Sequence, residues 1–164
     1  MELTQNPSVL ELVRKTAELT TPKEIVWIDG SEAQLKSLRK IAVETGELIK
    51  LNEEKLPGCY LNRSDVNDVA RVEGRTFICS KTREAAGPTN NWMDPDEMKA
   101  KLHEILRGAM TDRTMYIIPY SMGPIGTPFA KYGIEITDSI YVVLNMAIMT
   151  RIGIKVLEAL GDSS

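Results

Sequence analysis

Apolar residues follow two different spacings along the first third of this chain. A three- to four-residue spacing predicts helices, and short apolar runs bounded by turn residues predict buried strands. The predicted order is helix, strand, helix and strand, over residues 7–20, 24–30, 31–45 and 48–51. Asn6 before Pro7 is typical of a helix start, and Ser31 with Gln34 three positions later resembles a capping box. This order favours an α/β unit.

Loop-rich and strongly patterned segments alternate along the rest of the chain. A helix should begin at Asp94 and Pro95 and continue to residue 106, because an aspartate cap followed by proline suits a first helical turn. The helix expected at residues 141–151 is apolar nearly all round, which predicts burial. The other expected elements are strands at residues 59–61, 76–79, 114–120 and 133–137, and a short helix at residues 155–160. The expected fold class is therefore α/β with mixed α+β character, in which a mixed sheet is flanked by helices.

Composition narrows the class of protein. The chain has 164 residues, of which 43% are hydrophobic and 26% charged, and this is ordinary for a single soluble domain. The net charge of −3 argues against nucleic acid as a partner, since such binding needs clustered Lys and Arg. No apolar run approaches the ~20 residues of a membrane span, and the amino terminus lacks a signal-peptide pattern. We therefore expect a cytoplasmic protein with no membrane partner.

Motifs that identify an active site by themselves are missing from the sequence. The chain has no P-loop pattern, no Gly-x-Gly-x-x-Gly fingerprint and no Gly-x-Ser-x-Gly elbow. Its single histidine, His103, falls mid-helix among charged residues and is interpreted as a surface residue. Cys59 and Cys79, near predicted strands, are interpreted as buried, unreactive thiols, and two cysteines do not support a zinc site.

Two segments carry a much more specific pattern. They read CYLNRSDVNDVARVE at residues 59–73 and RTMYIIPYSMGPIGTP at residues 113–128. Together with residues 133–139 and 151–153, they closely resemble the amino-terminal region of the GTP-dependent phosphoenolpyruvate carboxykinases. The resemblance extends over residues 6–162, and the length and order of these segments argue against a chance match.

The resemblance implies an enzyme of gluconeogenesis that converts oxaloacetate and GTP to phosphoenolpyruvate, GDP and carbon dioxide. It also implies manganese and magnesium as cofactors, in a parent protein that is monomeric. The metal ligands, P-loop and guanine pocket of the family have no counterpart here, so residues 1–164 are expected to form a partial amino-terminal substrate-binding domain. Alone, this chain should be inactive and should bind no cofactor. The alternative is a non-catalytic binding module that reuses the same fold.

Arg71 is the residue for which the resemblance implies contact with substrate. It matches the arginine that holds the carboxylate of oxaloacetate or phosphoenolpyruvate, and a planar guanidinium can donate two parallel hydrogen bonds to a carboxylate. The alternative is a surface arginine paired with Asp68 or Glu73. Gly74 departs from the family pattern, in which serine is common at this position.

The glycine- and proline-rich segment at residues 121–128 could be a phosphate-binding loop. However, no lysine or hydroxyl stands at the phosphate-loop spacing, and Pro124 and Pro128 lack backbone N–H donors. We interpret the segment as a rigid loop beside the active cleft.

Overall fold

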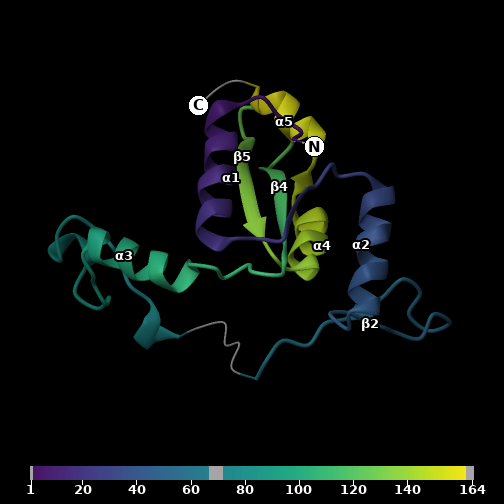
Figure 1. Ribbon diagram of the computed structural model, residues 1–164, viewed down its shortest axis with the longest axis horizontal. Helices are drawn as coiled ribbons and strands as arrows, with labels where there is room; N and C mark the ends of the chain where they lie inside the picture. The colour runs from purple at the N-terminus through teal and green to yellow at the C-terminus, as the bar shows by residue number, and fades with distance from the viewer. Residues whose placement is uncertain (1, 67–71, 162–164) are drawn as a thin grey trace.

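The computed structural model describes residues 2–66 and 72–161. At its centre is a mixed four-stranded sheet with helices on both faces (Figure 1), which confirms the expected fold class. None of the helices in these ranges is long and apolar enough to cross a membrane. The elements in chain order are α1 (Pro7–Thr20), β1 (Glu24–Trp27), α2 (Glu32–Glu44), β2 (Ile49–Lys50), β3 (Tyr60–Leu61), η1 (Glu73–Arg75), η2 (Glu84–Ala86), α3 (Pro95–Leu106), β4 (Thr114–Met122), β5 (Lys131–Thr137), α4 (Ile140–Met149), β6 (Arg151–Ile152) and α5 (Ile154–Leu160).

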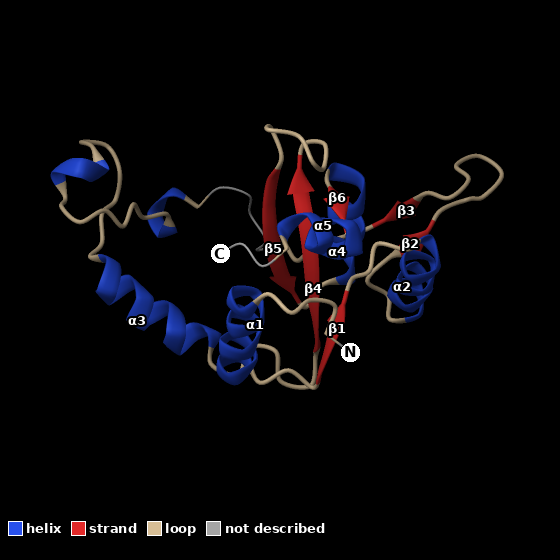
Figure 2. Ribbon diagram, turned by 90° about the horizontal axis from the view of Figure 1, so that it is seen from above, coloured by secondary structure: helices blue, strands red, loops and turns tan. Residues whose placement is uncertain are grey.

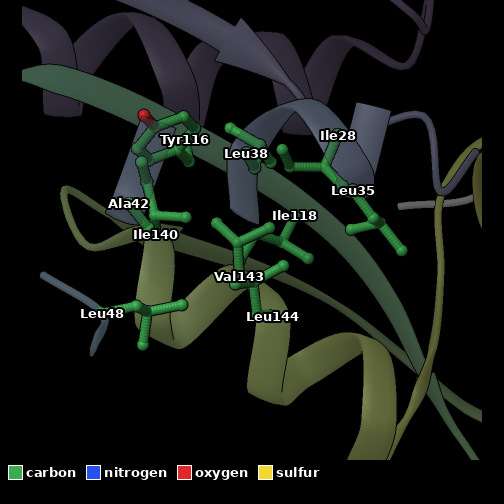
Figure 3. Packing of buried hydrophobic residues seen from close by; sticks show 10 residues of the cluster. All are labelled: Ile28, Leu35, Leu38, Ala42, Leu48, Tyr116, Ile118, Ile140, Val143 and Leu144. Atoms are coloured by element: carbon green, nitrogen blue, oxygen red, sulfur yellow. The ribbon is translucent and has the colours of Figure 1, made fainter. Parts of the chain in front are cut away.

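The hydrophobic core forms on both faces of β4, the central strand. β4 runs parallel to β1 and antiparallel to β5 and β6. Because side chains alternate between the faces of a strand, Tyr116 and Ile118 pack with residues of α2 and α4 (Figure 3). Met115 and Ile117 pack on the other face with residues of α1 and α5. Burial on both faces explains the continuous apolar run that predicted this strand.

Pro119 lies in the middle of β4, where a proline would normally remove a hydrogen bond of the sheet. Along one edge, however, β4 changes its partner: β1 ends opposite Ile117, and β6 pairs from Tyr120 onward. The nitrogen of Pro119 falls between these two partners, and its carbonyl accepts a hydrogen bond from Gly153 N at 3.0 Å. The change of partner therefore explains how a central strand accommodates a proline.

The start of α1 follows its local sequence signal and also closes the fold. Asn6 caps the helix by accepting a hydrogen bond from Val9 N at 3.1 Å, with Pro7 in the first turn, as expected. The Asn6 side chain is buried, and its Nδ2 donates to the Gly161 carbonyl at 2.9 Å. This bond joins the first helix to the end of α5, which lies beside it in Figure 1.

The start of α2 confirms one half of the expected capping box. Ser31 Oγ accepts a hydrogen bond from Gln34 N at 3.2 Å. The other half is wrong, because the Gln34 side chain does not return to Ser31. Its Oε1 accepts from Asp29 N at 2.9 Å, and its Nε2 donates to the Trp27 carbonyl at 2.8 Å. Gln34 therefore holds the end of β1 against the first turn of α2.

The helix that was expected to be buried all round is α4, and that expectation is wrong. Val143 faces the core, whereas Ile148 near its end is 81% exposed. The helix also ends before the expected boundary, because Arg151 adopts an extended conformation and pairs with Ser121 of β4. Pairing with the sheet therefore replaces the last helical turn.

The described residues between β3 and β4 form an arm that extends away from the sheet (Figure 2). The strand expected at residues 76–79 is reduced to one bridge between Ile78 and Trp92. α3 is the only α-helix in this described arm and begins after Asp94, which accepts from two backbone N–H groups, as expected. Figure 2 shows α3 apart from the sheet, with α1 beside one of its ends.

Candidate functional site

Arg71, the residue expected to bind substrate, lies outside the described residues, as does Asp68. Its role therefore stays a prediction. In the sequence, β3 precedes it and η1 (Glu73–Arg75) follows it. Gly74 in η1 is exposed, and a Cβ at this position would meet no other atom within 4 Å. The local structure therefore has room for the serine that the resemblance leads one to expect.

A cleft of about 430 Å³ lies where the start of the first resemblance segment meets α2 and α4. Tyr60 and Asn62 come from that segment, and Tyr141 and Asn145 come from α4, which follows the second segment. The structure thus brings together residues that are about half the chain apart. The loop at residues 121–128 does not line this cleft. The remaining lining residues are Arg39, Leu48, Gly58, Leu144 and Ile148.

Among the described residues, Arg39 is the only cationic one that lines the cleft. Its side chain projects from α2 and is 34% exposed. The ion pair to Glu32 is long, at 3.8 Å between Nη1 and Oε2, and Glu32 itself is highly exposed. A distance of that length is beyond hydrogen-bond range, so the guanidinium keeps donors for another anion.

Glu47 connects three parts of the chain at one edge of the cleft. Its Oε1 accepts from Ser139 Oγ at 2.6 Å and from Tyr141 N at 2.9 Å, and its backbone carbonyl accepts from Asn62 Nδ2 at 2.8 Å. A carboxylate at a helix start is favoured by the helix dipole, so Glu47 stabilises the first turn of α4. Burial raises the pKa of Tyr116, and the Glu47 charge adds to that shift.

Sequence reasoning missed both Glu47 and Arg39. Glu47 lies 92 residues before Ser139, and nothing in the sequence around it marks a capping carboxylate for a distant helix. Arg39 stands among other charged residues on an amphipathic helix, so its position beside a cleft has no local signal.

The cleft presents groups for binding, without a catalytic pair. A nucleophile or general base needs an oriented partner, and the lining residues within the ranges 2–66 and 72–161 include no His, Cys, Ser, Asp or Glu. Within the described part of the chain, no three residues of the types His, Cys, Asp and Glu gather into a possible metal site. The residues described here therefore do not fit a metal centre, and no metal-dependent step is assigned to them.

Several backbone N–H groups of the loop between β4 and β5 donate to acceptors within the loop or in β5. Gly126 N donates to Tyr132 Oη at 3.0 Å, and both N and Oγ1 of Thr127 donate to the Pro124 carbonyl. Gly123 has a φ of +85°, which favours glycine. Because these donors already have partners, the structure favours the interpretation as a rigid loop over a phosphate cradle.

Two further expectations have different outcomes. His103 is exposed on α3, as expected of a surface residue. Cys59 and Cys79 are both exposed free thiols, so the expectation of buried thiols is wrong. Cys59 precedes the two-residue strand β3, and Cys79 follows an isolated bridge, so neither residue belongs to the buried central sheet.

Comparison with known proteins gives a consistent result along the chain. A family described as "Phosphoenolpyruvate carboxykinase N-terminal domain" matches residues 11–164. A protein named phosphoenolpyruvate carboxykinase [GTP] from Corynebacterium kroppenstedtii is 55% identical over 159 residues, which is 97% of this chain and 26% of that protein. Proteins of the same name from Neocallimastix frontalis and Anaeromyxobacter dehalogenans are each 54% identical over 95% and 98% of this chain. The chain spans about a quarter of the length of these relatives.

Proposed function

We propose that this chain, which belongs to the phosphoenolpyruvate carboxykinase N-terminal domain family, forms the amino-terminal part of a GTP-dependent carboxykinase. The family match over residues 11–164 carries this proposal. Relatives at 52–55% identity that carry the name of the enzyme support it. Residues 1–164 would then form a partial substrate-binding domain. No observation favours the alternative of a free-standing, non-catalytic module.

The proposed reaction converts oxaloacetate and GTP to phosphoenolpyruvate, GDP and carbon dioxide. The bond between the departing carboxyl carbon and C3 breaks, and its electron pair forms the enolate of pyruvate. The enolate oxygen then takes the γ-phosphoryl group of GTP, and GDP leaves. Divalent manganese and magnesium would stabilise the developing negative charge when they are bound. The described residues form no metal site, so these ions would be held elsewhere in the enzyme.

In this proposal, Arg71 holds the carboxylate that remains on the substrate. A guanidinium donates two parallel hydrogen bonds to a carboxylate, which fixes both the position and the rotation of that group. A substrate held in this way keeps its carbon skeleton in place while carbon dioxide departs, and orientation of this kind lowers the activation barrier. We further propose a monomeric cytoplasmic enzyme that binds oxaloacetate and phosphoenolpyruvate and neither nucleic acid nor membranes.

A fusion enzyme tests the proposed function. It joins this chain to the part of the Corynebacterium kroppenstedtii relative that lies beyond the matched segment. We expect the fusion enzyme to form phosphoenolpyruvate from oxaloacetate only when GTP and a divalent metal are supplied, and the 164-residue chain alone to form none. A folded fusion enzyme without activity would contradict the proposal.

Arg71→Ala in the fusion enzyme tests the substrate contact. We expect kcat/KM for oxaloacetate to fall by about 100-fold, since a hydrogen bond between charged groups contributes about 1.5–3 kcal/mol. Arg71→Lys should recover only part of the loss, because an ammonium cannot donate the parallel pair. The matched control is Arg75→Ala, an exposed arginine in η1. Equal effects of the substitutions at residues 71 and 75 would show that Arg71 is not the carboxylate ligand.

A further inference from the structure

α3 carries an apolar stripe that is left largely exposed among the described residues. Met98, Leu102, Ile105 and Leu106 fall within a sector of about 100° around the helix axis, the width of a typical core-facing stripe. Yet no residue of α3 is buried. Leu102, Ile105 and Leu106 are 45%, 73% and 42% exposed, so this stripe, here called the α3 stripe, faces solvent.

The charged residues of α3 pair with one another along the helix. Lys99 lies 3.8 Å from Asp96, Lys101 lies 2.8 Å from Glu97, and Arg107 beyond the helix end lies 3.4 Å from Glu104. Each pair joins residues three or four positions apart, and together the three pairs are neutral. These charges therefore give the helix no excess of either sign with which to attract a partner. A partner of the α3 stripe must be recognised through apolar contact.

The end of α3 is firmly attached to the body of the fold. Gly108 N donates to the Leu19 carbonyl at 2.9 Å, and Met110 N donates to the Thr20 carbonyl at 3.0 Å. Both acceptors lie in the last turn of α1, the helix that α3 contacts. The direction in which α3 leaves the body is therefore set by backbone hydrogen bonds, and the α3 stripe is presented in a defined orientation.

A helix of this length needs tertiary contact to be stable. Helices shorter than about 12–15 residues are marginal in water, and most helical stability in proteins comes from packing of an apolar face. α3 has 12 residues, none of them buried, and among the described elements its main contact is with α1. The α3 stripe is therefore an apolar face that needs contact with a further surface to stabilise the helix.

We propose that the α3 stripe docks onto an apolar surface in the part of the enzyme that lies outside this quarter, and that this contact stabilises α3. The proposal rests on the proposed function, since the relatives that define the family extend over about four times the length matched here. That additional chain is the occupant favoured over a second copy, because in the relatives from Corynebacterium kroppenstedtii and Neocallimastix frontalis it belongs to the same polypeptide and is therefore present at a ratio of one to one.

The fusion enzyme and the 164-residue chain together test this proposal by amide hydrogen exchange. The amides at residues 99–106 are the informative ones, because the first four N–H groups of a helix have no helical acceptor. We expect weak protection in the chain alone and at least about 10-fold stronger protection in the fusion enzyme. Equal protection in both proteins would overturn the proposal. Protection in the chain alone that rises with protein concentration would also overturn it, in favour of a second copy.

Two substitutions separate docking from helix stability. Ile105→Lys places a charge in the α3 stripe, and Ala100→Lys places the same charge on the exposed opposite side of the helix. In the fusion enzyme we expect Ile105→Lys to lower protection of α3 by about 10- to 100-fold, the equivalent of losing one buried isoleucine. Ala100→Lys should change it by less than about threefold. In the chain alone, neither variant should matter, because lysine is a good helix former.

The outcomes for docking and for function can be distinguished. A fusion enzyme that is active while α3 stays unprotected refutes docking and leaves the function in place. A fusion enzyme in which α3 is protected without activity supports docking and refutes the proposed reaction. Equal effects of Ile105→Lys and Ala100→Lys would refute the α3 stripe as the contact surface. Should Ile105→Lys prevent folding of the fusion enzyme, the comparison of the two unsubstituted proteins still decides the question.

Discussion

Replacement of Gly153 by alanine tests how the last part of the chain is joined to the sheet. Gly153 is buried between β6 and α5, with a φ of +102°. A Cβ at this position would fall on the backbone carbonyl of Asp29, two residues after the end of β1. Gly30 makes the reciprocal approach, because its Cβ would lie 2.5 Å from the Ile152 carbonyl oxygen. Two backbone segments therefore meet here with no room for a side chain on either.

The expected loss of stability has two sources. Gly153 has a φ of +102° and a ψ of −158°, a region essentially restricted to glycine, and an L-residue held there costs about 1–3 kcal/mol. The clash is with backbone atoms, so relief requires the two segments to separate. Separation would break the hydrogen bonds from Gly153 N to the Pro119 carbonyl and from Ile154 N to the Asp29 carbonyl, at 3.0 and 3.2 Å. At about 1 kcal/mol for each hydrogen bond, the total reaches about 3–5 kcal/mol, a large fraction of the 5–15 kcal/mol typical of a domain.

Urea unfolding of the chain, followed by circular dichroism and by the fluorescence of buried Trp27, measures this loss. Gly46→Ala is the matched control, because Gly46 has a similar φ of +80° but no atom within 4 Å of its Cβ position. We expect Gly46→Ala to cost only the backbone strain of about 1–2 kcal/mol. If Gly153→Ala and Gly46→Ala lowered the urea midpoint of unfolding equally, the close backbone approach at Gly153 would make no contribution to stability. That result would refute the predicted difference between the two variants.

Two further predictions concern carboxylates. Glu47→Ala should destabilise the chain by about 2 kcal/mol in urea unfolding, because it leaves two donors at the start of α4 without their charged acceptor. Glu47→Gln should cost less, because an amide oxygen can still accept from these donors. Equal losses of stability in the two variants would contradict this role of the Glu47 side chain. Hydrogen bonds from Arg14, then from Lys15, lower the pKa of Glu11 from 4.5 to about 2. A pKa depressed by folding gives a stabilisation that is present above pH 4.5 and is lost as the pH falls toward 2. Glu11 should therefore still be ionised at about pH 3 in an NMR titration, and Arg14→Ala should raise its midpoint; an unchanged midpoint would contradict the assignment of the shift to Arg14.

Local signals in the sequence fix most helix starts and the central strand. Asn6, Ser31 and Asp94 each cap the helix that their position predicts, because a cap bonds to N–H groups only two or three residues away. The apolar run of β4 identifies a strand that is buried on both faces. The two segments that resemble the carboxykinases are also local, so the family can be read from the sequence before any contact is known.

The candidate cleft could not be read in this way. Arg39, Tyr60 and Asn145 line it together although they belong to separate elements, and Glu47 supports it through partners 92 and 94 residues away. The exposure of Cys59 and Cys79 likewise depends on which strands join the central sheet. β3, beside Cys59, and the bridge at Ile78, beside Cys79, are not part of that sheet.

By itself, the sequence determined the helix caps, the buried central strand and the family, because each depends on residues close together in the chain. Only the tertiary structure decided that Pro119 marks a change of strand partner, that Gly153 must lack a side chain and that the α3 stripe is left exposed. These features depend on which distant segments come into contact. The free energy of such a contact is set by packing between the two segments, and the residue pattern within one segment does not reveal it.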